Sequence, residues 1–154
     1  ADPRITANLG LLYSQQGRLD GAATLFRQSL ATDPAQPLTW VNLGIALAAA
    51  GDPGGARQAY EEALRLNPHE ALAHFNLGNL HQRAERLDDA VAAYRRAVAA
   101  DPGLGRGHFE AGRLLIRLER YAEALPHARR AVEFMPDHAP SRQMLTDLLS
   151  VVGP

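Results

Sequence analysis

One interval recurs along the chain without change, and it constrains the fold more than any other feature. Three residue types return at this interval: Pro34, Pro68, Pro102 and Pro136; Gly10, Gly44, Gly78 and Gly112; and Ala22, Ala56, Ala90 and Ala124. The interval is 34 residues, as from Pro34 to Pro68. A period of this length marks a structural unit that recurs in space, because each unit buries its apolar face against its neighbours. The sequence therefore predicts an array of repeats that presents a surface.

Within each period the pattern predicts two amphipathic helices. In the second period, a broad apolar surface covers residues 37–50, and a stripe at helical spacing covers residues 53–66. Gly51 lies between them and suits the end of a helix, because glycine adopts positive φ without strain. Asp52 followed by Pro53 is typical of the start of the next helix.

Bulky and small residues follow one motif within each period. The second period shows the motif most fully, with Trp40, Leu43, Gly44, Leu47, Ala56, Tyr60, Ala63 and Pro68. The fourth period departs most, because Ala128 stands where an aromatic residue is usual and Pro126 lies early in the second helix. We expect that helix pair to be looser, or its second helix to start late. The motif resembles that of the tetratricopeptide repeat family.

The resemblance implies an all-α, right-handed superhelical solenoid of four helix-turn-helix repeats. The expected repeats span residues 3–36, 37–70, 71–104 and 105–138. Residues 139–152 then form a C-terminal capping helix or the first helix of a truncated fifth repeat, with an apolar stripe that includes Met144 and Leu148. Because the chain starts inside the first helix of the first repeat, we expect it to be a piece of a longer protein.

Composition argues against several classes of function. The formal net charge is −1, whereas binding the phosphates of nucleic acids requires a large basic excess. No apolar run approaches the roughly 20 residues needed to span a bilayer, so no membrane insertion is predicted. The chain has no cysteine, and all of its basic residues are arginine, which we interpret as the codon bias of a GC-rich, bacterial genome. The composition does not determine the cellular compartment, and the cytoplasm is the default expectation.

No catalytic constellation is evident, so we expect neither enzyme activity nor a cofactor. The glycine-rich segment 51–55 lacks the Lys-Ser/Thr pair of a phosphate-binding loop. Histidines raise the question of a metal site, because His74 and His108 occupy one motif position and His81 could face His108. These positions are aromatic in the family, and we therefore interpret the histidines as partly buried, hydrogen-bonded rings. No metal site is predicted.

In the family, the first helix of each repeat lines a concave groove that binds extended peptides. The resemblance and the helical period together select the following candidate peptide-binding residues: Asn8, Asn42, Asn76, Asn79, Leu38, Val41, Ile45, Leu72, Phe75, Arg83, Phe109, Arg113 and Arg117.

Asparagine recurs at one position of three successive repeats, as Asn8, Asn42 and Asn76, and the series stops at Glu110. A side-chain amide donates and accepts hydrogen bonds, so it can pair with a peptide backbone of any sequence. The series is similar to the asparagine ladder in the repeat arm of O-linked N-acetylglucosamine transferases. Alternatively, these amides hydrogen-bond between neighbouring helices.

The candidate groove changes character along its length. Its middle is apolar, whereas the C-terminal part carries Arg83, Arg106, Arg113 and Arg117, and arginine suits carboxylates. We therefore expect a ligand with an apolar segment followed by an acidic segment or a C-terminus; a mixed, solvated face is the alternative. Ala7 and Leu11 replace the Lys and Asn of the carboxylate clamp in chaperone-binding relatives, so that ligand is not predicted.

The leading hypothesis is a non-enzymatic protein–protein interaction module. A second is a self-assembling scaffold, in which an open end of the array or the apolar groove accepts the 139–152 helix of another copy. A third is the substrate-recruiting arm of a larger enzyme such as a glycosyltransferase. The expected partner is a protein or peptide, with no nucleic acid.

Overall fold

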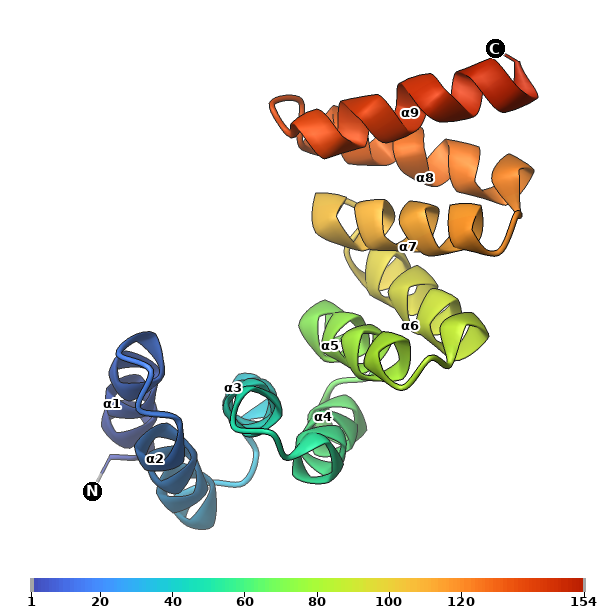
Figure 1. The fold of residues 1–154 in the computed structure, drawn as a ribbon. Helices are drawn as coiled ribbons and strands as arrows, with labels where there is room; N and C mark the ends of the chain where they lie inside the picture. The colour runs from blue at the N-terminus through green and yellow to red at the C-terminus, as the bar shows by residue number, and fades with distance from the viewer. Residues whose placement is uncertain (1, 154) are drawn as a thin grey trace. The chain divides into compact units, whose positions relative to one another are not determined.

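A computed structural model describes residues 2–153, and within this range it contains α-helices and no strand. The all-α fold class that the sequence predicts is confirmed. The helices are α1 (Pro3–Gln15), α2 (Leu19–Thr32), α3 (Pro37–Ala49), α4 (Pro53–Leu66), α5 (Ala71–Arg83), α6 (Leu87–Ala100), α7 (Gly105–Arg117), α8 (Tyr121–Phe134) and α9 (Ala139–Val152) (Figure 1).

The helix boundaries repeat with the period of the sequence. The helices α1, α3, α5 and α7 each have 13 residues, and the helices α2, α4, α6 and α8 each have 14. Within either series the helices begin at the same constant interval as the recurring prolines, and α9 begins one such interval after α7. We call α1, α3, α5 and α7 the first helices, and α2, α4, α6 and α8 the second helices.

The chain divides into two compact units, one ending at Leu80 and the other beginning at His81. In the first unit, α2 packs against both α1 and α3, and α3 packs against α4. In the second unit, α7 packs against both α6 and α8, and α8 packs against α9 (Figure 1). Each unit therefore buries its core between helices that are consecutive in the chain.

A glycine lets an aromatic ring approach the backbone of the first helix. A Cβ atom added at Gly44 would lie 2.4 Å from Tyr60 Cε1, and one added at Gly10 would lie 2.7 Å from Phe26 Cε1. Phe26 and Tyr60 are both buried. The two rings therefore occupy the space that a side chain at the glycine would need.

The α7–α8 pair achieves the same arrangement without a ring. Ala128 stands in the register of Phe26 and Tyr60, and it is buried. The nearest side-chain atom to a Cβ added at Gly112 is Met144 Cε of α9, at 3.2 Å. A flexible methionine from the following helix thus occupies the space left by the missing ring.

The expectation that the second helix of this pair starts late is wrong. α8 begins at Tyr121, in register with the other second helices, and contains Pro126. Because Pro126 is the sixth residue of α8, it removes the one hydrogen bond that its N–H would have donated to the Ala122 carbonyl. The helix continues through it to Phe134.

A side-chain hydrogen bond joins the start of a first helix to the proline six residues earlier. Trp40 Nε1 donates to the Pro34 carbonyl at 2.9 Å, and His74 Nε2 lies 3.0 Å from the Pro68 carbonyl. The equivalent pairs are His108 with Pro102, at 3.1 Å, and Arg142 with Pro136. The interpretation of His74 and His108 as hydrogen-bonded rings is therefore confirmed.

The turns between paired helices use a left-handed residue at one register position. Gly17 and Gly51 have φ of +73° and +87°, and Glu85 and Glu119 have φ of +57° and +59°. After Gly51, the Asp52 side chain accepts a hydrogen bond from the Gly55 N–H at 2.8 Å. The expected helix start at Asp52 is thus confirmed.

The glycine contacts generate a stability prediction. We expect Gly44→Ala to lower the free energy of unfolding by about 1–2 kcal/mol, because the overlap with Tyr60 outweighs the gain in helix propensity. Gly112→Ala is the matched control. It should be neutral or stabilise by up to about 1 kcal/mol, because the Met144 side chain can move. Urea unfolding followed by circular dichroism measures both, and equal effects would contradict the contact argument.

Candidate functional site

The first unit carries a hollow of about 490 Å³ on the faces of α1 and α3. It brings together three of the predicted peptide-binding residues, Asn8, Leu38 and Asn42. Its full lining is Arg4, Ala7, Asn8, Leu11, Gln36, Pro37, Leu38, Thr39 and Asn42. The wall therefore combines one charged residue, Arg4, and several neutral polar groups with exposed leucine side chains.

The two asparagines of this hollow are free to bind a ligand. Within residues 2–153, neither the Asn8 nor the Asn42 side chain makes a hydrogen bond to the protein. Asn8 is exposed and Asn42 is half-buried. Each therefore offers an amide N–H₂ group and a carbonyl oxygen beside the exposed side chains of Leu11 and Leu38.

Asn76 and Asn79 differ from these two residues because their amides are engaged within α5. Asn76 Nδ2 donates to the Leu72 carbonyl at 2.8 Å, and Asn79 Nδ2 donates to Asn76 Oδ1 at 3.3 Å. The series of asparagines is therefore not uniform. Among the described residues, Asn8, Asn42 and Asn76 make no side-chain hydrogen bond to a neighbouring helix, which was the alternative role.

The predicted apolar residues divide into exposed and buried groups. Leu38, Ile45 and Leu72 are exposed, whereas Val41 and Phe75 are buried. Val41 belongs to the hydrophobic core of the first unit. A ligand can therefore touch the first three residues directly, and Val41 supports the surface from beneath.

The second unit carries a hollow of about 380 Å³ between α7 and α9. Its predicted members are Phe109 and Arg113, and its full lining is Phe109, Arg113, Ile116, Tyr121, Pro140, Gln143, Met144, Asp147, Leu148 and Val151. The walls are mainly apolar, with Arg113, Gln143 and Asp147 as polar groups. Most of the remaining lining comes from α9, so the prediction based on the first helices missed it.

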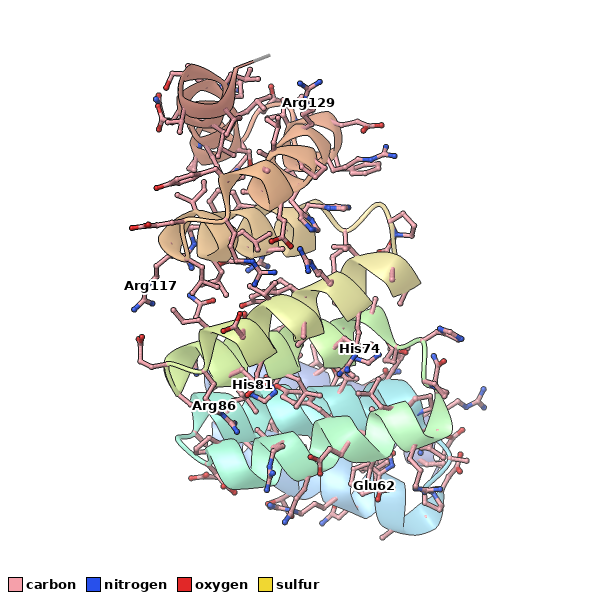
Figure 2. The ribbon with its side chains drawn as sticks, turned by 90° about the vertical axis from the view of Figure 1, so that its right-hand side faces the viewer. Glu62, His74, His81, Arg86, Arg117 and Arg129 are labelled. Carbon is pink, nitrogen blue, oxygen red and sulfur yellow. The ribbon has the colours of Figure 1, made fainter. Side chains whose placement is uncertain are left out.

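Two of the predicted arginines of the second unit already hold carboxylates. Arg113 pairs with Glu110 of the same helix at 2.6 Å, and Arg117 pairs with Glu85 at 2.6 Å. Figure 2 shows Arg117 projecting away from the ribbon. Exposed ion pairs contribute roughly 0–1 kcal/mol, so a ligand carboxylate can replace either glutamate at little cost.

A buried tyrosine lies within electrostatic reach of the same charged groups. Tyr94 donates a hydrogen bond to Gln82 Oε1 at 2.9 Å. Burial and the Glu110 carboxylate raise the pKa of Tyr94, whereas Arg113 and Arg83 oppose the rise. Arg83 and Arg113 therefore both lie within electrostatic range of the Tyr94 hydroxyl group.

A pair of histidines lies between α7 and α8. The Nδ1 atoms of His108 and His127 are 3.1 Å apart. Because His108 Nε2 must donate to the Pro102 carbonyl, a neutral His108 accepts at Nδ1 and His127 Nδ1 donates to it. Phe134 stacks on the His108 ring at a centroid distance of 6.2 Å. The ring contacts of His108 are therefore made with α8.

The surroundings of both histidines favour the neutral ring. Burial lowers the pKa of His108, and burial together with the neighbouring His108 lowers the pKa of His127 to about 4. Across residues 2–153, no three potential ligand side chains cluster in a way that could hold a metal ion. The pair was not foreseen from the sequence, because His127 lies outside the repeating motif.

Among the described helices, none combines the length and apolar character needed to cross a membrane.

Comparisons with known proteins identify the repeat and the fold. Models of the tetratricopeptide repeat match residues 4–32, 41–105 and 75–139, which together exceed half of the chain. A search of curated protein sequences gives no match.

Solved structures with 20% identity share the fold. PilF of Pseudomonas aeruginosa matches with a TM-score of 0.84, covering 97% of this chain and 68% of PilF. A crystal structure of MamA matches with a TM-score of 0.79, covering 94% of this chain and 84% of MamA. A MamA structure from Desulfovibrio magneticus gives 0.79, with 97% and 84% covered. The likeness shows a helical-repeat solenoid.

The histidine pair generates a pH prediction. Unfolded histidine takes up a proton near pH 6.5, whereas folded His127 does so near pH 4. Below pH 6.5 the unfolded chain therefore binds more protons, and stability falls as the pH drops toward 4. We expect the loss to be on the order of 1–2 kcal/mol after allowing for partial solvent exposure.

Urea unfolding at several pH values measures this loss. His127→Gln should flatten the dependence between pH 6.5 and pH 4. The matched control is His69→Gln, which changes an exposed histidine and should leave the wild-type dependence in place. An unchanged slope in His127→Gln would contradict the assignment.

Proposed function

The chain belongs to the tetratricopeptide repeat family, and from this premise we propose that it is a protein–protein interaction module that binds extended peptide segments. Helical-repeat arrays present extended surfaces to partners. The observation that carries the proposal is the hollow on α1 and α3, where two asparagine amides without an internal hydrogen bond adjoin exposed leucines. A ligand would complete the hydrogen bonds that the fold leaves open.

The proposed contacts at Asn8 and Asn42 involve the ligand backbone. An extended peptide presents N–H and C=O groups along its length, and each asparagine amide can satisfy one of each kind. Because these groups occur in every peptide, the asparagines would provide affinity without sequence preference. Leu11 and Leu38, which line the same hollow, would favour apolar ligand side chains by removing them from water.

The hollow of the second unit would supply the selective part of the interaction. Its apolar wall, which includes Phe109, Ile116 and Val151, suits one large apolar side chain. Arg113 lines the same hollow and can exchange Glu110 for a carboxylate of the ligand. We therefore include an acidic group next to an apolar residue in the proposed ligand.

The proposal also divides the chain into repeats. Residues 3–36, 37–70, 71–104 and 105–138 form four repeats in this division, which the common spacing of the helix boundaries supports. The helix α9 begins at the register of a first helix, and its residues Met144 and Leu148 are buried. It thus has the position of a first helix and covers the exposed side of α8.

The asparagine contacts can be tested with peptides selected by display on the wild-type protein. We expect Asn8→Ala/Asn42→Ala to weaken every selected peptide about tenfold, because each lost hydrogen bond contributes roughly 0.5–1.5 kcal/mol. Asn76→Ala is the matched control. It should have a smaller effect, since its amide already donates to the Leu72 carbonyl. Calorimetry showing wild-type affinities for the double variant would refute the proposed site.

The arginine contact makes a separate prediction about ligand charge. Arg113→Glu should weaken acidic peptides by about tenfold or more, because one attraction becomes a repulsion, and should change neutral peptides little. Arg129→Glu is the control with the same change of charge, at an exposed position of α8 (Figure 2). If both variants weaken acidic peptides equally, the effect is a general one of net charge and the Arg113 contact is wrong.

A further inference from the structure

The first unit has another hollow, of about 460 Å³, among the helices α2, α3 and α4. Ligand sites typically have volumes of roughly 300–1,000 Å³. Its floor is apolar and its rim is charged, and its lining is Arg27, Trp40, Leu43, Leu47, Gly55, Gln58, Ala59, Glu61 and Glu62. None of these residues lines the α1–α3 hollow, so the two hollows are separate. We call this one the α2–α4 hollow.

The charges on the rim of the α2–α4 hollow are not all matched. Glu62 pairs with Arg65 at 2.8 Å, and Glu61 lies 4.0 Å from Arg57, so both glutamates have an arginine of their own helix. Arg27 of α2 is exposed, and within residues 2–153 its side chain makes neither an ion pair nor a hydrogen bond. The unmatched charge of the hollow is therefore the positive charge of Arg27.

The second unit shows the same place with two further side chains in it. The helices α6, α7 and α8 stand two periods after α2, α3 and α4 and pack in the same order. Four positions of the α2–α4 hollow then correspond to residues of the second unit, namely Arg27 to Arg95, Trp40 to His108, Gly55 to Glu123, and Ala59 to His127. The arginine is thus repeated and a ring is kept, whereas the two small residues become a carboxylate and an imidazole.

The two larger residues of α8 satisfy their neighbours on α6 and α7. Arg95 pairs with the Glu123 carboxylate at 2.6 Å, and the rings of His108 and His127 lie 5.3 Å apart between centroids. In the first unit, Gly55 has no side chain and Ala59 has only a methyl group. The α2–α4 hollow therefore lacks a carboxylate beside its arginine and a flat ring beside Trp40.

We propose that the α2–α4 hollow is a second binding site, which takes one acidic residue and an adjacent aromatic residue of a partner peptide. The ligand carboxylate pairs with Arg27, and the ligand ring packs on Trp40. A peptide is the occupant because the groups that fill the corresponding place in the second unit are themselves side chains of a polypeptide. Glu61 and Glu62 on the opposite rim repel further carboxylates, so a long acidic run is excluded. The site goes beyond the proposed function and does not depend on the α1–α3 hollow.

The position of Trp40 provides a direct measurement of binding, because it is the only tryptophan of the chain. Nitrogen–proton correlation spectra of the whole chain follow its indole N–H during titration with the blocked dipeptide N-acetyl-Glu-Phe-amide. We expect a saturable shift, and about threefold or more weaker binding of N-acetyl-Gln-Phe-amide, which lacks the carboxylate. No saturable shift up to roughly 10 mM, or equal affinities for the two dipeptides, overturns the proposal.

Two arginine variants separate this site from the proposed peptide site. Arg27→Gln should weaken binding of N-acetyl-Glu-Phe-amide to the level of the glutamine dipeptide, because the carboxylate loses its partner. Arg4→Gln is the matched control, since it removes the same charge from the α1–α3 hollow and should leave the affinity unchanged. Weaker binding in Arg4→Gln with wild-type binding in Arg27→Gln places the dipeptide in the α1–α3 hollow and overturns the proposal.

A variant that supplies the missing carboxylate tests the comparison between the two units. Gly55→Glu should weaken N-acetyl-Glu-Phe-amide about threefold more than Gly55→Gln does, because the introduced carboxylate pairs with Arg27 as Glu123 pairs with Arg95. The Asp52 side chain must move to admit either side chain at position 55, so the two variants share this demand. Circular dichroism verifies that both remain helical. Equal affinities for the dipeptide in the two variants overturn the assignment of Arg27.

Discussion

The approach of each second helix to its first helix sets the geometry on which the candidate sites depend. In the first unit this approach is defined by Phe26 and Tyr60 lying against Gly10 and Gly44. Because the ring and the glycine stand at one register position in both helix pairs of this unit, α1 and α3 turn the same face inward. The faces of the first helices that do not pack against the second helices stay at the surface. Asn8, Asn42 and Leu38 are left at the surface because the packing face is already occupied.

The connection between successive helix pairs depends on a hydrogen bond rather than on a particular side chain. An indole, two imidazoles and a guanidinium all donate to the proline carbonyl at the same register position. The position therefore requires an N–H donor of suitable reach, and its aromatic character is secondary. At His108 this role also determines the tautomer, which in turn sets the direction of the hydrogen bond with His127.

Much of the fold could be predicted from the sequence, because the constant interval between recurring glycine, alanine and proline residues indicates where helices begin and end. The candidate site was less predictable. A helical wheel assigns Val41 and Phe75 to the groove, yet both are buried, since a wheel does not show how deeply neighbouring helices cover a border position. The hollow beside α9 depends on residues outside the repeating motif, such as Val151. Ala128 was the available signal for the changed packing, because the loss of a ring leaves space that Met144 fills.

The left-handed turn residues have a consequence for the unfolded chain. Gly17 and Gly51 adopt positive φ without strain, but glycine loses the most backbone freedom when the chain orders. Glu85 and Glu119 adopt the same conformation at a cost of about 1–2 kcal/mol each, and they have less freedom to lose. Forming the turns of the first unit thus costs mainly backbone entropy, and forming those of the second unit costs mainly conformational strain. The same turn conformation therefore has two different sources of free-energy cost within a single chain.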